Sequence, residues 1–161
     1  MSVIPEIAYE TVEKKLRQRG KMLKKAEDAV ARARERATDI SAPSGDVTGN
    51  GKGGAGGSRV ERGALAVFRA EKRLEYVMKW EAVFRKMDEI YPAEDSNEGF
   101  VASMIYGNGM SQADLARFTG CSRQTIRVRQ DRYVIRCAFL AAQAGLIREE
   151  VEKYGNTDQK E

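Results

Sequence analysis

The sequence contains no histidine and only two cysteines, and these absences exclude whole classes of chemistry. Without histidine, a Cys–His nucleophile and most zinc sites cannot be built. Cys121 and Cys137 are too few for a secreted disulfide framework and fit no metal-binding spacing, so we expect each to be a small buried apolar group. Asp and Glu are abundant, but no carboxylate pair stands in a recognisable catalytic arrangement. The sequence therefore predicts a protein that is not an enzyme and that uses no metal or cofactor.

Long apolar runs are missing as well. The stretch MSVIPEIAYE has no apolar core of the kind that a signal peptide needs. No window of the sequence approaches the ~20 apolar residues of a membrane span. We therefore expect a cytoplasmic protein that does not enter a membrane.

Basic residues are present in a small excess, and they are concentrated in two stretches. The 161 residues carry 28 Lys and Arg against 24 Asp and Glu, which gives a net charge of +4. Residues 13–36 hold ten basic and four acidic side chains, and residues 111–136 hold six Arg and two Asp. After Gly145 the balance becomes acidic. Local basic surfaces of this kind are typical of proteins that bind a polyanion.

The N-terminal stretch predicts a charged amphipathic helix with a narrow, alanine-rich seam. Leu16, Leu23, Val30 and Ala37 recur every seven residues, and Arg19 occupies a slot between them. Such a seam needs a partner, which is either the central helix of the chain or its copy in a second subunit. The alternative is a solvated helix without a partner.

Helix-starting and helix-ending residues divide the rest of the chain. Ser58 can cap a long helix that Pro92 stops, Asn97 can cap a short one, and Gly145 can end the last. No stretch alternates convincingly enough for a strand, so we predict an all-α fold in which long helices, joined by a Gly-rich linker, precede a helix-turn-helix domain. The predicted segments are an N-terminal charged helix (1–41), a Gly/Ser-rich linker (42–58), a long central helix (59–92), the helix-turn-helix domain (97–146) and a flexible acidic tail (147–161).

The central helix has an apolar face whose residues are spaced by three and four. Trp80 falls outside this face, so we expect it to pack against a neighbouring element and not to serve as a ligand platform. The residues of the predicted face are Val60, Ala64, Val67, Phe68, Leu74, Val77, Met78, Phe84, Met87 and Tyr91.

The stretch SQADLARFTGCSRQTIRVRQ predicts two helices joined by a tight turn. Ser111 and Ser122 are placed to cap the two helices. Counted from Gln112, the small residue Ala116, a glycine and the β-branched Ile126 occupy the fifth, ninth and fifteenth positions. This spacing is typical of the DNA-reading helix-turn-helix, although hairpins in unrelated proteins can show it too.

The outward side of the second helix carries side chains that suit DNA. Arginine can bind guanine bidentately, glutamine can bind adenine, and valine can pack on a thymine methyl group. The alternative is a solvated arginine-rich face, for which Asp131, four residues after Arg127, supplies the only acidic partner. Arg132 and Arg136 suit phosphates, and the stem of Arg129 should pack while its head reaches the surface. We predict that the DNA-binding residues are Gln112, Ser122, Arg123, Gln124, Thr125, Arg127, Val128, Asp131, Arg132 and Arg136.

This stretch resembles region 4 of sigma-70 type factors, whose recognition helix often begins Ser-Arg-Glu and continues Val-Arg-Gln. The matching residues here are Ser122, Arg123 and Gln124, followed by Ile126, Arg127 and Val128. The resemblance implies that Arg123, Gln124, Arg127 and Val128 meet the −35 region of a promoter. It also makes RNA polymerase a candidate partner.

The wider layout resembles the ArpU-like phage regulators over residues 53–147. The shared features are a Gly-rich segment before SRVERG, a long helix ending at IYP, and RYVIRCAFLAAQ after the helix-turn-helix. The resemblance implies control of phage or prophage late genes. The predicted function is sequence-specific binding of double-stranded DNA by a transcriptional regulator, with a homodimer as a candidate state. The alternative is a DNA-packaging protein of the small terminase type, which would form large rings.

Overall fold

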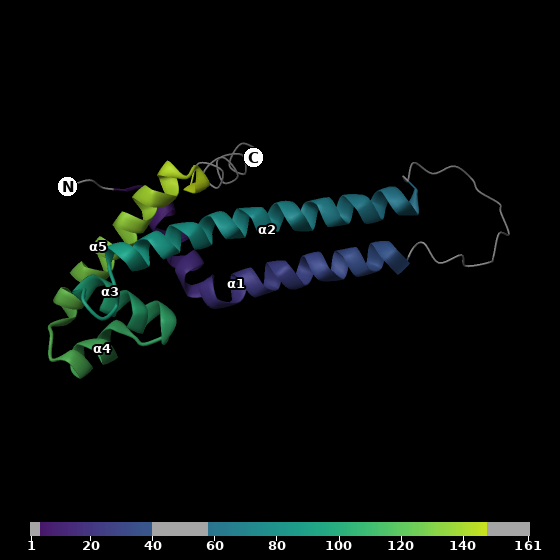
Figure 1. Cartoon of the computed structure of the whole chain (residues 1–161). Helices are drawn as coiled ribbons and strands as arrows, with labels where there is room; N and C mark the ends of the chain where they lie inside the picture. Colours follow the sequence, from purple (N-terminus) through teal and green to yellow (C-terminus); the bar gives the residue numbers. More distant parts are fainter. Residues whose placement is uncertain (1–3, 40–57, 148–161) are drawn as a thin grey trace, which may run out of the picture. The chain divides into compact units, whose positions relative to one another are not determined.

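The computed structural model describes residues 4–39 and 58–147, and all regular elements in these ranges are helices (Figure 1). The predicted all-α fold is confirmed for these residues. The predicted linker, apart from Ser58, and the predicted acidic tail, apart from Ile147, lie outside the described ranges. Among the described residues, none of the helices combines the length and the apolar character that a membrane span requires. In chain order the elements are α1 (Glu6–Asp39), α2 (Arg59–Ile90), α3 (Asn97–Ala102), the π-helical turn η1 (Ser103–Gly107), α4 (Gln112–Thr119) and α5 (Arg123–Gln143).

Local signals set most of the helix ends. Ser58 and Glu61 form a reciprocal capping box at the start of α2, with N···O distances of 3.0 and 3.2 Å. The predicted cap of α3 is wrong by one residue, because Ser96 and not Asn97 accepts the hydrogen bond from the backbone N–H of Gly99. Gly145, with φ of 77°, follows the end of α5 as expected.

The chain divides into two compact units, and α1 and α2 contribute to both. The first unit takes the described residues up to Gly20 and from Lys79 onward, and the second takes those between Lys21 and Met78. In the second unit Arg34 of α1 pairs with Glu71 of α2 at 2.7 Å. In the first unit Arg19, which belongs to the α1 seam, bonds Glu81 and Asp88 of α2, and this contact supports the first of the predicted alternatives, packing on the central helix of the same chain.

The predicted apolar face of α2 is partly wrong in this second unit. Val60, Phe68 and Met78 are 70, 56 and 58% exposed. The reason is geometric: two paired helices cover only the narrow stripe between them, so part of an apolar face wider than that stripe stays in solvent. Val30 of the α1 seam is buried there, as is Ala26 one turn before it.

The first unit has a denser core, to which α1, α2 and α5 all contribute. Trp80 is fully buried, as is Phe84, and their ring centroids lie 5.8 Å apart. The expected packing role of Trp80 is therefore confirmed. Arg19, the polar residue of the α1 seam, bonds Glu81 and Asp88 of α2. Burial alone would lower the pKa of Arg19, but its hydrogen bonds to these carboxylates raise the pKa further than burial lowers it.

Candidate nucleic-acid interface

The helix-turn-helix has the local geometry that its sequence predicts. Ser111 caps α4 by accepting a hydrogen bond from the backbone N–H of Asp114 at 3.1 Å, and Ser122 caps α5 in the same way through Thr125 at 3.1 Å. Between them, Gly120 has φ of 71° and ψ of 10°. This left-handed conformation is costly for residues with a Cβ atom, so glycine is the residue that fits here.

A small apolar core holds the two helices together. Leu115 of α4 and Ile126 of α5 are fully buried against Val101 and Ile105. Ala116 and Cys121 are half-buried at its edge. Cys121 therefore packs on the core without being enclosed in it, which is less burial than we expected.

Cys137 is fully buried, as predicted. Burial raises the pKa of its thiol to about 12. At neutral pH the thiol is protonated, and it is not a nucleophile. Within the described ranges, no group of His, Cys, Asp or Glu could hold a metal ion.

The outward side of α5 presents unpaired arginines. Arg123, Gln124 and Arg127 are exposed in its first two turns, and Val128 beside them is 38% exposed. No hydrogen bond or ion pair links Arg123, Arg127 or Arg136 to another residue that the structure describes. These guanidinium groups are therefore free to bind an external acceptor.

Other predicted residues are held by partners within the protein. The hydroxyls of Ser122 and Thr125 lie 2.8 Å apart at the helix cap. Gln112 donates to Oε1 of Gln130 at 2.6 Å. Arg132 lies 3.5 Å from the carboxylate of Glu98, a contact that water screens because the Arg132 side chain is largely exposed.

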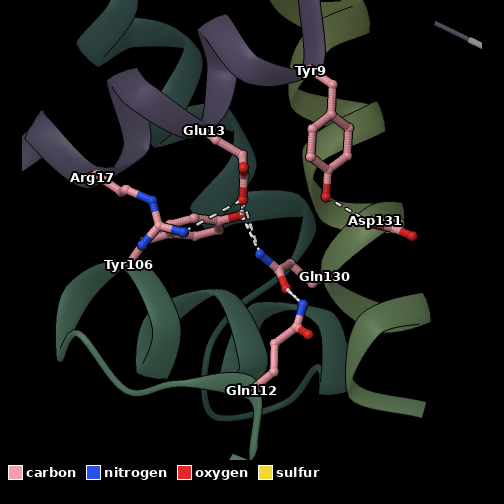
Figure 2. Close-up of polar contacts among 7 residues, drawn as sticks. All are labelled: Tyr9, Glu13, Arg17, Tyr106, Gln112, Gln130 and Asp131. Atoms are coloured by element: carbon pink, nitrogen blue, oxygen red, sulfur yellow. Dashed lines mark hydrogen bonds and ion pairs between the residues drawn. The ribbon is translucent and has the colours of Figure 1, made fainter. Parts of the chain in front are cut away.

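Asp131, another predicted DNA-binding residue, also has a partner within the protein. The alternative of a solvated arginine-rich face would pair it with Arg127, four residues earlier on α5. Instead, Asp131 accepts a hydrogen bond of 2.6 Å from the hydroxyl of Tyr9 on α1 (Figure 2). It forms no ion pair with Arg127. Asp131, the acidic side chain that a solvated arginine face would need as a partner, is thus hydrogen-bonded to α1.

A polar network that the sequence reading missed anchors α5 to α1 (Figure 2). Gln130 is buried, and its Nε2 donates to Glu13 at 3.0 Å and to the Tyr106 hydroxyl at 2.8 Å. Tyr106 in turn donates to Glu13 at 2.7 Å. Burial is the main cause that raises the pKa of Tyr106, and the hydrogen bond to Glu13 raises it further, so the hydroxyl stays protonated.

One signal could have found this network. Gln130 lies four residues after the buried Ile126 and four before the buried Val134, so its amide points inward. A buried amide needs partners. The identity of those partners depends on where α1 lies, and the sequence does not reveal that.

The start of α1 and the helix-turn-helix border an open pocket of about 1250 Å³. Arg127 and Asp131 line it from α5, and Tyr9 and Glu13 line it from α1. The N-terminal turns of α1 therefore border the predicted DNA-reading side of α5.

Comparisons with family models, with curated proteins and with solved structures returned no match to this chain.

Proposed function

We propose that this protein is a sequence-specific DNA-binding transcriptional regulator that places α5 in the major groove. The observation that carries the proposal is the set of unpaired, exposed arginines on α5, immediately after the turn of a helix-turn-helix. Arg123 and Arg127 lie in the first two turns, the part of a recognition helix that reaches base edges. Gln124 and Val128 lie beside them and add an adenine-binding amide and an apolar contact for thymine.

Electrostatics supports a polyanionic partner. Arginines that share one helix face repel one another unless acidic side chains compensate them. On α5 the nearest acidic side chain, Asp131, is hydrogen-bonded to Tyr9, and the one contact of Arg132 with an acidic side chain of the described residues is the screened one with Glu98. A row of phosphates would supply the missing negative charge.

The resemblance to sigma-70 region 4 and to ArpU-like regulators supports a promoter as the target. On this basis we propose control of phage or prophage late genes, with RNA polymerase as a further partner.

We also propose that the regulator works as a homodimer. Paired half-sites match the two-fold symmetry of a dimer. Val60, Leu65 and Phe68 expose apolar surface on one stretch of α2, which a second copy could cover. The mass in solution tests this: a dimer supports the proposal, whereas a large ring favours the packaging alternative.

Selection from a pool of random duplexes, followed by titration of the enriched sequence at several salt concentrations, tests the proposed function. We expect one enriched motif and an affinity for it that is roughly 10³-fold or more above that for a scrambled duplex. Binding without an enriched motif would mean that α5 only grips the backbone. No binding to any duplex would leave the helix-turn-helix as a structural hairpin.

A further inference from the structure

Tyr9 and Asp131 form a contact whose consequence falls on Arg127. An arginine and an aspartate four residues apart on one helix are close enough to pair. On α5 they do not pair: Oδ1 of Asp131 accepts a hydrogen bond from the hydroxyl of Tyr9 at 2.6 Å (Figure 2). The Arg127 guanidinium has no partner in the part of the chain that the structure describes.

The position of Tyr9 is fixed by the helix that carries it. Ala8 and Val12, on either side of Tyr9, are 3 and 0% exposed. One turn later Glu13 accepts hydrogen bonds from Gln130 and Tyr106. The turn of α1 that carries Tyr9 is therefore held in place beside Asp131.

The chemistry of the Tyr9 hydroxyl suits this contact. Burial raises the pKa of Tyr9, and the hydrogen bond to Asp131 raises it further, so the hydroxyl remains a donor at neutral pH. A neutral donor satisfies the carboxylate without adding a positive charge that would compete for phosphate.

We propose that Tyr9 is a positioning residue for DNA recognition: by holding the Asp131 carboxylate, it keeps Arg127 unpaired and available to a base. The inference rests on the proposed function. Without Tyr9, Asp131 would turn to Arg127, and the intrahelical ion pair would have to break before Arg127 could bind guanine. The N-terminal helix is then a part of the DNA reader, although none of the predicted DNA-binding residues lies on it.

The test is a double-mutant cycle on the full-length chain, with the selected duplex and a scrambled duplex as probes. Tyr9→Phe keeps the ring and removes only the hydroxyl. We expect it to weaken binding to the selected duplex about fivefold, the upper end for an exposed ion pair, and to change binding to the scrambled duplex less than twofold. In an Asp131→Asn background, adding Tyr9→Phe should change either affinity less than twofold, since no carboxylate remains to capture Arg127.

Tyr91→Phe is the matched control. The Tyr91 ring packs on Tyr133, but its hydroxyl makes no hydrogen bond to the described residues, so both affinities should stay at the wild-type values. Thermal unfolding of each variant verifies that α1 is still docked.

The possible outcomes separate this inference from the proposed function. If the wild type prefers the selected duplex and Tyr9→Phe leaves that preference unchanged, this inference is overturned and the proposed function stands. A loss of the same size in the Asp131→Asn background also overturns it, because Tyr9 would then act through helix packing and not through the carboxylate. A wild-type chain with no preference at all overturns the proposed function, and the inference with it.

Discussion

At the scale of single residues, Arg127 and Arg136 carry the same charge but lie at different positions along α5. Both are exposed on α5 and both lack a partner among the described residues. At 1.5 Å per residue, Arg136 lies about 13 Å further along the helix axis. Because a recognition helix contacts base edges mainly with its N-terminal part, the proposed function predicts that Arg127 meets bases and Arg136 a phosphate.

Alanine substitutions should separate these two roles. Arg127→Ala should cost about 1–3 kcal/mol on the selected duplex and little on a scrambled one, because a bidentate base contact is lost. Arg136→Ala should weaken both duplexes alike and lower the salt slope by about one unit, because a phosphate contact is lost. The measurement is a binding titration of both variants on both duplexes at several salt concentrations. Equal losses on the two duplexes for Arg127→Ala would contradict base reading.

At the scale of elements, the sequence predicted the features that depend only on residues close together in the chain, such as helix caps and turns. The caps Ser111 and Ser122 and the turn at Gly120 could be predicted, because a cap and a left-handed φ need only a few consecutive residues. That Trp80 is fully buried while Phe68 is exposed could not be predicted from the apolar spacing of α2. Apolar spacing shows that a helix has a covered side, but the neighbouring elements decide which stripe is covered.

The same distinction holds for the candidate interface. The outward direction of Arg123 and Arg127 follows from the period of α5 once Ile126 faces the core. The contact of Asp131 with Tyr9 joins residues 122 positions apart. Such a contact depends on the packing of α1, and a local pattern carries no information about it.

Two helical glycines should respond in opposite directions to substitution by alanine. A Cβ atom at Gly20 of α1 would meet no atom within 4 Å, so Gly20→Ala should stabilise the protein by about 0.5–1 kcal/mol through better helix propensity. A Cβ atom at Gly99 of α3 would overlap the backbone carbonyl of Tyr91. Backbone must then move, and Gly99→Ala should cost about 1–3 kcal/mol.

Denaturant unfolding of the two variants beside the wild type measures both changes. An unchanged slope of free energy against denaturant would show that neither substitution alters the surface exposed on unfolding. A stable Gly99→Ala variant would mean that α3 can move away from Tyr91 without loss.

At the scale of the whole molecule, the buried titratable groups set how stability depends on pH. Burial is the first cause that raises the pKa of Tyr9, Tyr106, Tyr133 and Cys137, and all four belong to the first unit. In the unfolded chain these groups lose their protons near pH 8.5 for cysteine and near 10 for tyrosine. Above those values the unfolded state releases protons that the folded state keeps, so rising pH favours unfolding.

We therefore expect the free energy of unfolding to be highest below about pH 8.5 and to fall steadily as the pH rises toward 11. The fully buried Cys137, whose pKa is raised to about 12, should alone remove roughly 2 kcal/mol between about pH 9 and 11. Denaturant unfolding at intervals across this range measures the slope. Cys137→Ala is the informative variant: it should lower stability at every pH, because it leaves a cavity, and yet flatten the alkaline slope. If Cys137→Ala leaves the alkaline slope of stability against pH unchanged, the thiol is not its cause. A free energy of unfolding that rises with pH would contradict the raised pKa values of all four groups.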